Sequence, residues 1–103
     1  MTATDGRDVK FDEVCDIVAP IAKKHGVERI YLFGSRARGT NDMNSDFDFY
    51  IIPGRIRTLI NLCGLIRELE EALGREVDII AEEPSLKEEF LKEVLRDRRL
   101  VYG

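Results

Sequence analysis

Asp46 and Asp48 are the residues of this sequence whose type and spacing point most directly to chemistry. They lie in the segment 46–52 (DFDFYII), whose aromatic and β-branched residues predict a strand. Residues two apart on a strand point to the same face, so the two carboxylates should lie side by side, with Cα atoms roughly 7 Å apart. Such a pair repels itself unless a cation holds it, and oxygen ligands favour Mg²⁺ or Mn²⁺ over Zn²⁺. The simpler alternative is that both flank a strand end in solvent.

A third carboxylate, Asp78, interrupts the apolar segment 77–81 (VDIIA), which also predicts a strand. Next to a metal-binding pair it could hold a second ion and take the proton of an attacking hydroxyl, as two-metal phosphoryl or nucleotidyl transfer requires. A single Asp in a strand is otherwise an ordinary solvent-facing residue. The prediction therefore depends on whether the fold brings Asp78 to the pair.

A Gly-Ser turn comes directly after another apolar segment, 29–33 (RIYLF). Gly34 allows the backbone close to a ligand, and Ser35 could cap the next helical turn while its hydroxyl meets a phosphate. Arg36 and Arg38 add positive charge to the same loop. Facing three carboxylates, this loop would form a triphosphate cradle; without them it would be an ordinary turn.

The sequence partly matches two other motifs, a P-loop and an EF-hand loop, but lacks residues that each of them requires. The spacing of Gly34 and Gly39 fits a P-loop, but Thr40-Asn41 stands where Lys-Ser/Thr must be. The segment from Asp42 resembles the start of an EF-hand loop, but Phe47 replaces the required Gly and Pro53 the required Glu.

Hydrophobic periodicity supplies the elements that must position these residues. Helices are predicted over 11–25 and 59–73, each followed by a glycine, Gly26 and Gly74. A third helix is predicted over 85–96, with Ser85 as N-cap and Glu88 completing a capping box. Strands are predicted over 29–33, 46–52 and 77–81. The helix over 59–73 is expected to bury a stripe of Leu59, Leu62, Ile66, Leu69 and Leu73.

The lengths of the connections predict how the strands lie. Twelve residues separate the first strand from the second, too few for a full parallel crossover, so these two should be antiparallel. The second and third strands are joined through a long helix and should be parallel. If they are neighbours, Gly34-Ser35, Asp46, Asp48 and Asp78 converge on one edge of a small mixed sheet with flanking helices, an α/β (α+β) fold.

Composition limits the class of protein. The chain has 103 residues, 44% hydrophobic and 35% charged, which predicts one globular domain over 1–103. The formal net charge of −4 makes nucleic acid an unlikely partner. No apolar run approaches 18 residues and no signal-peptide pattern begins the sequence, so we expect no membrane association and a cytoplasmic location.

Two further features concern the surface. Cys15 and Cys63 lie in apolar helical patterns and are expected to be buried free thiols. Leu100, Val101 and Tyr102 follow the last helix and either fold back onto the core or form part of a protein interface, including self-association.

With these residues in place, the sequence resembles a known family. Gly34-Ser35, ten intervening residues and Asp46-Phe47-Asp48 resemble the G-S-x10-D-x-D signature of polymerase-β-like nucleotidyltransferases. The GSRARG segment and the Ser-Asp before the second carboxylate are most similar to the minimal, MNT-type members. The resemblance implies a nucleoside triphosphate donor, most simply ATP. It also implies a divalent metal held by Asp46, Asp48 and Asp78, and a triphosphate bound at Gly34 and Ser35.

The resemblance also implies a class of acceptor. Stand-alone minimal members are often partnered with a small helical HEPN-domain ribonuclease toxin, which some neutralise by adenylylating a tyrosine. AMP transfer to such a partner is the function that we predict. Two alternatives are a non-catalytic antitoxin that only binds its partner, and a transferase whose small-molecule or RNA acceptor is held by a separate chain.

Overall fold

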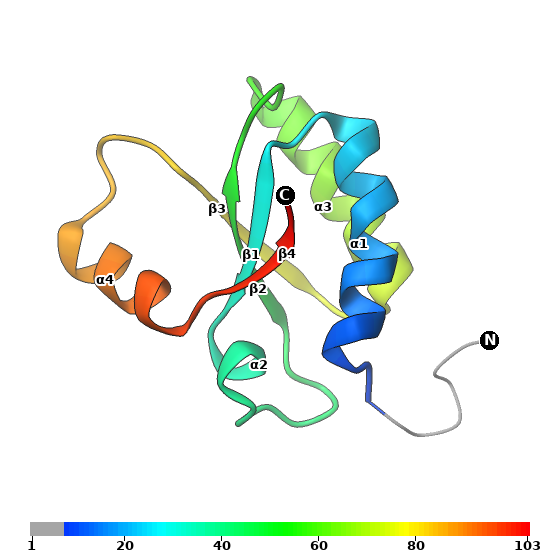
Figure 1. Ribbon diagram of the computed structural model, residues 1–103. Helices are drawn as coiled ribbons and strands as arrows, with labels where there is room; N and C mark the ends of the chain where they lie inside the picture. Colours follow the sequence, from blue (N-terminus) through cyan, green and yellow to red (C-terminus); the bar gives the residue numbers. More distant parts are fainter. Residues whose placement is uncertain (1–7) are drawn as a thin grey trace.

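The structure is a computed structural model and describes residues 8–103 (Figure 1). Four helices and four strands alternate along this part of the chain. In chain order they are α1 (Phe11–His25), β1 (Arg29–Phe33), α2 (Ser35–Arg38), β2 (Phe47–Ile52), α3 (Leu59–Leu73), β3 (Val77–Ala81), α4 (Glu88–Asp97) and β4 (Arg99–Tyr102). The three predicted strands and the first two long helices are confirmed, to within a residue at each end.

The strands form one mixed sheet in the order β3-β2-β1-β4. β1 pairs antiparallel with β2, and β2 pairs parallel with β3, as the connection lengths predicted. The sheet therefore brings the end of β1 next to the starts of β2 and β3. This arrangement is what positions the candidate site.

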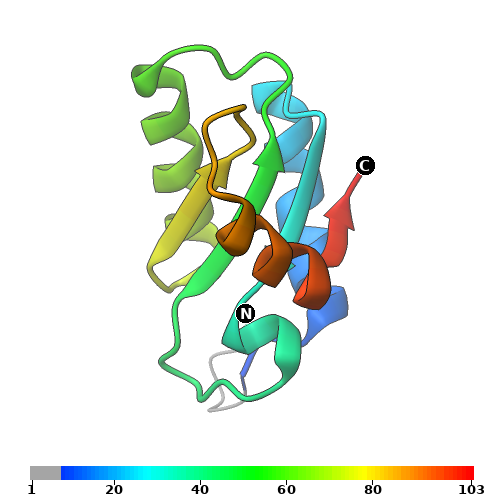
Figure 2. The same ribbon diagram turned by 90° about the vertical axis from the view of Figure 1, so that its left-hand side faces the viewer.

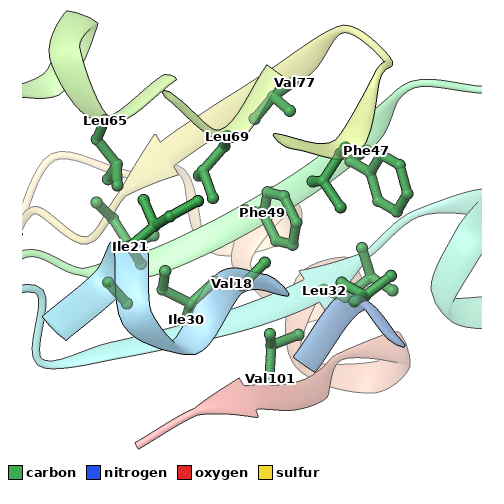
Figure 3. Close-up of a cluster of buried hydrophobic side chains, with 14 of the residues drawn as sticks. Val18, Ile21, Ile30, Leu32, Phe47, Phe49, Leu65, Leu69, Val77 and Val101 are labelled. Carbon is green, nitrogen blue, oxygen red and sulfur yellow. The ribbon is translucent and has the colours of Figure 1, made fainter. Parts of the chain in front are cut away.

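The main core lies between the sheet and the α1–α3 layer (Figure 1). Alternate residues of β2, Phe47, Phe49 and Ile51, point into this layer and are buried, as strand geometry requires. Figure 3 shows Leu65 and Leu69 of α3 reaching toward the same cluster from the helix side. Burial of these three residues fixes the register of β2. The residues between them, Asp48 and Tyr50, therefore lie on the opposite face of the sheet.

α4 covers part of the opposite face (Figure 2). Val94 packs there against Tyr31 and Tyr50, and Phe90 meets Phe33 edge to face, with ring centroids 6.0 Å apart. Because the side chains of a strand alternate, Asp48 points to this face of the sheet and not into the main core.

The apolar stripe of α3 differs from the predicted one. Leu65, Leu69 and Leu73 are the buried members, whereas Leu59 is 74% exposed and Ile60 83% exposed. Together with Cys63, which is exposed and not buried as expected, they line an apolar hollow of about 370 Å³. Cys15 is half-buried.

Two features near the C-terminus also differ from expectation. Residues 99–102 form a fourth strand on the free edge of β1, with Val101 buried, so the alternative that Val101 belongs to an exposed interface is wrong. Ser85 does not cap α4; its hydroxyl donates to Glu83, and the helix begins after Lys87. Within the described residues, no helix is long and apolar enough to cross a membrane.

Candidate active site

The turn after β1 approaches a carboxylate of the neighbouring strand. Gly34 has φ +74° and ψ −157°, a backbone conformation that side-chain-bearing residues rarely adopt. A Cβ built at this position would collide with the Asp48 carboxylate. Gly34 also occupies the N-cap position of α2, and Ser35 is its first helical residue, so the expectation that Ser35 caps the turn is wrong. Glycine is needed here because the Asp48 carboxylate lies where the side chain of any other residue would begin.

The strand register brings two of the three predicted carboxylates together. Asp48 is the partner of Phe33 in β1 and of Asp78 in β3, so the second and third carboxylates stand on adjacent strands at the same level. Asp46 lies one residue before β2 begins. Asp48 is half-buried, while Asp46 and Asp78 are exposed. The predicted convergence of the turn and the carboxylates on one edge is therefore what the topology produces.

The electrostatics of Asp48 reflect this proximity. Burial raises the pKa of its carboxyl group, and the negative charges of Asp78 and Asp46 raise it further. The positive charge of Arg38 acts in the opposite direction but does not cancel them. The three carboxylates thus give the site a negative charge, which Arg38 neutralises only in part.

Arg38 stands between this site and α4. Its Nη1 donates to Asp97 Oδ2 at 3.2 Å, linking α2 to the C-terminal end of α4. About half of the Arg38 side chain is exposed, so its guanidinium has access to solvent as well as to Asp97. The phosphate-binding role of Arg38 stays a prediction.

Arg36 is directed elsewhere. Its side chain is 4% exposed and its guanidinium is engaged by Asp8 and by backbone carbonyls of the α2–β2 connection. The side chain has no free face for a phosphate, so we correct the expectation that Arg36 belongs to the triphosphate cradle.

A cleft of about 470 Å³ opens beside the carboxylates. Asp48 and Asp78 supply its charged residues, and the rest of its lining is apolar: Phe33, Ile66, Val77, Ile79, Ile80 and Phe90. Phe33 and Phe90, which line the cleft, and Asp97, which pairs with Arg38, are not among the predicted site residues. An aromatic residue in a strand or on the apolar face of a helix looks like core, and no local signal separates the two roles.

The donor set suits a hard divalent cation. All three carboxylates offer oxygen only, which Mg²⁺ and Mn²⁺ prefer. Burial is the main cause of the raised pKa of Asp48, and a bound cation would relieve the second cause, its repulsion by Asp78 and Asp46. As the side chains stand in residues 8–103, no three carboxylates, histidines or cysteines are grouped closely enough to enclose an ion. Asp46 and Asp78 are exposed, so their side chains are free to turn toward Asp48.

Comparison with known proteins gives relatives that match most of the chain. It is 38% identical over 90 residues, 84% of its own length and 97% of the relative, to MJ0435 of Methanocaldococcus jannaschii, which bears the name of a candidate protein adenylyltransferase. It is 35% identical over 77 residues to the protein adenylyltransferase MntA of Thermococcus cleftensis, covering 75% of this chain and 77% of that one.

Solved structures share the fold. A structure described as a candidate minimal nucleotidyltransferase superposes with a TM-score of 0.76 and 31% identity, over 92% of this chain and 97% of that one. An MNT antitoxin of Shewanella oneidensis, in complex with a tri-AMPylated HEPN toxin, has a TM-score of 0.69 at 19% identity and covers 91% and 73%. The mixed sheet with flanking helices is thus the polymerase-β-like fold that the sequence predicted.

The family model "Polymerase beta, Nucleotidyltransferase" matches residues 16–103, which include the turn after β1 and all three aspartates. The predicted family is confirmed: this chain belongs to the polymerase β nucleotidyltransferases and is an enzyme of that class.

Proposed function

We propose that this chain is a protein adenylyltransferase that transfers AMP from ATP to a tyrosine hydroxyl of a small helical HEPN-domain toxin, and so acts as its antitoxin. The observation that carries this proposal is the strand register, which pairs Asp48 with Asp78 beside the Gly34 turn. The names of the relatives from M. jannaschii and T. cleftensis support the reaction. The Shewanella complex, which shares the fold, suggests the kind of partner.

The reaction forms one bond and breaks one. The acceptor oxygen bonds to the α-phosphorus of ATP while the bond from that phosphorus to the bridging oxygen breaks, and pyrophosphate leaves. Asp78, exposed at the edge of the cleft, accepts the proton that the hydroxyl loses. The Gly34-Ser35 turn and Arg38 bind the triphosphate.

Asp46, Asp48 and Asp78 would hold Mg²⁺ or Mn²⁺. The ion would stabilise the negative charge that develops on the phosphate oxygens during transfer. The apolar wall of the cleft, with Phe33 and Phe90, suits a flat ring, whether adenine or the acceptor tyrosine.

The test uses the whole chain, ATP, Mg²⁺ and a HEPN-domain protein from the same organism. Intact-mass spectrometry should show an adenylyl group added to the HEPN protein, and peptide mapping should locate it on a tyrosine. Asp48→Asn should form the same complex without the mass gain. Complex formation with no mass gain from the unaltered chain would favour the non-catalytic antitoxin. Labelling of RNA, with binding that falls steeply as salt rises, would favour a nucleic-acid acceptor.

A further inference from the structure

Arg36 is a buried charge whose hydrogen bonds go to Asp8 and to the segment between α2 and β2. Its guanidinium lies 4.1 Å from the centroid of the Phe47 ring, and only 4% of the side chain is exposed. Burying a guanidinium is costly unless its N–H groups are paired, so the contacts it makes are required for it to stay there.

Three of these contacts hold the connection between α2 and β2. Arg36 Nε donates to Ser45 O at 2.9 Å, and Nη2 donates to Met43 O at 3.2 Å and to Asp42 O at 3.4 Å. These carbonyls lie in the segment 39–46, which is neither helix nor strand. A single side chain thus serves as a donor to three carbonyls of a segment that ends at Asp46.

The remaining contacts hold Arg36 itself. Its Nη1 lies 3.0 and 3.1 Å from the two carboxylate oxygens of Asp8, and Asn41 Nδ2 donates to the same carboxylate at 2.9 Å. Burial alone would raise the pKa of Asp8, but hydrogen bonds from Arg36, from the Val9 amide and from Asn41, with the charge of Arg36, lower it overall. Asp8 therefore stays ionised and neutralises the buried guanidinium.

We propose that Arg36 is a positioning residue for the carboxylate site: by holding the carbonyls of residues 42, 43 and 45, it fixes where Asp46 stands relative to Asp48. Ser45 O, at the shortest distance among its backbone contacts, belongs to the peptide unit that leads into Asp46. Asp8 acts one step further away, by fixing Arg36. The proposal deepens the proposed function and rests on it for the role of Asp46.

The test measures Mn²⁺ binding without turnover, by electron paramagnetic resonance of the free ion, together with kcat and KM for AMP transfer. Arg36→Lys keeps the charge but cannot reach three carbonyls and Asp8 together, and Asp8→Asn removes the charge that holds Arg36. We expect both to weaken Mn²⁺ binding and to lower kcat, with Arg36→Lys losing about tenfold to a hundredfold and Asp8→Asn less. The KM for the HEPN acceptor should change little.

Val18→Ala is the matched control. Val18 is fully buried in the main core on α1 and lies outside the segment 39–46 and the Gly34 turn, so we expect this variant to lose stability without a change at the site. At a temperature where all variants are folded by circular dichroism, Val18→Ala should bind Mn²⁺ as the unaltered chain does. If Arg36→Lys binds Mn²⁺ and turns over as the unaltered chain does, the proposal is wrong. If Arg36→Lys does not fold, unchanged Mn²⁺ affinity and kcat in Asp8→Asn would overturn it instead. Failure of the unaltered chain to transfer AMP would count against the proposed function, while the Mn²⁺ measurement would still decide the role of Arg36.

Discussion

At the scale of single residues, Asp48 is a carboxyl group whose ionised form the folded protein disfavours. Its pKa is raised above the ordinary 3.8 by burial and by Asp78 and Asp46. A group whose pKa is higher in the folded state contributes stability below its unfolded pKa, and this contribution is lost as pH rises through the folded value. At neutral pH, ionised Asp48 therefore costs stability in the metal-free protein.

We predict that Asp48→Asn abolishes AMP transfer yet is at least as stable as the unaltered chain at neutral pH in EDTA. The advantage of the variant should shrink as pH falls toward about 4, where Asp48 becomes protonated in both states. Urea unfolding midpoints at several pH values check this. A variant that is less stable at neutral pH, or that still transfers AMP, would contradict the account of Asp48.

Gly34 offers a second test at the level of one residue. Gly34→Ala should lose activity, because its new Cβ collides with the Asp48 carboxylate. Gly74→Ala is the control: Gly74 also has a positive φ, +69°, but no neighbouring atom lies within 4 Å of its added Cβ. Gly74 is in the left-handed helical conformation, so Gly74→Ala should lose about 1–2 kcal/mol of stability from backbone strain and keep its transfer rate. Gly34→Ala should lose more stability, because ψ −157° at positive φ is a conformation adopted almost only by glycine. Equal loss of activity in the two variants would mean that strain, not collision, disables the site.

The carboxylates and the turn could be predicted from the sequence, but not that Arg36 is buried while Arg38 stays accessible. Both follow the turn and both carry the right charge. Residues two apart on a helix do not face the same way, so one helical turn cannot direct both toward the phosphates. Arg36 is the one that points into the protein, because Asp8 and the carbonyls of residues 42, 43 and 45 bind its guanidinium. Spacing alone does not reveal these contacts.

At the scale of the elements, the predictable parts are those with a long hydrophobic period. α1 and α3 have 15 residues each and end at glycines in the left-handed conformation, and both were predicted. β4 was missed because it has four residues and follows α4 after Arg98 alone, without a turn signal. The start of α4 was misplaced because Ser85 bonds to Glu83 and not to the helix.

Because β4 completes the sheet, its two apolar residues should differ in their response to the same substitution. Val101 is 8% exposed and Leu100 49% exposed. Val101→Thr places a hydroxyl among apolar side chains and should cost about 1–3 kcal/mol, whereas Leu100→Thr should stay within about 0.5 kcal/mol. Denaturant titrations of the two variants measure the difference. Equal, small costs would show that β4 is not docked on β1 in solution.

At the scale of the whole molecule, the two faces of the sheet are covered unequally. α1 and α3 together cover one face, while α4 alone lies across the other and leaves the cleft beside Asp48 and Asp78 (Figures 1 and 2). Asp48 and Asp78 thus lie on the less covered face, beside the cleft in which the proposed reaction would take place.

The two thiols also differ in burial, although both lie in the α1–α3 layer. Cys63 is exposed, while Cys15 is half-buried, and burial together with Asp12 and Asp16 raises the pKa of Cys15. A higher pKa leaves less of the reactive thiolate at a given pH. We predict that Ellman's reagent titrates one thiol rapidly in the native protein and two in denaturant, and that Cys63→Ser removes the rapid phase. Two rapid thiols in the native state would contradict the burial of Cys15.

The exposed thiol of Cys63 lies beside Leu59 and Ile60, so the α3 hollow can be labelled without altering Asp46, Asp48 or Asp78. An environment-sensitive fluorophore attached at Cys63 would sit in water in the isolated chain. Its emission would shift to shorter wavelength as soon as another molecule covered those apolar side chains. Encounters on α3 could then be timed by stopped flow separately from the transfer of AMP.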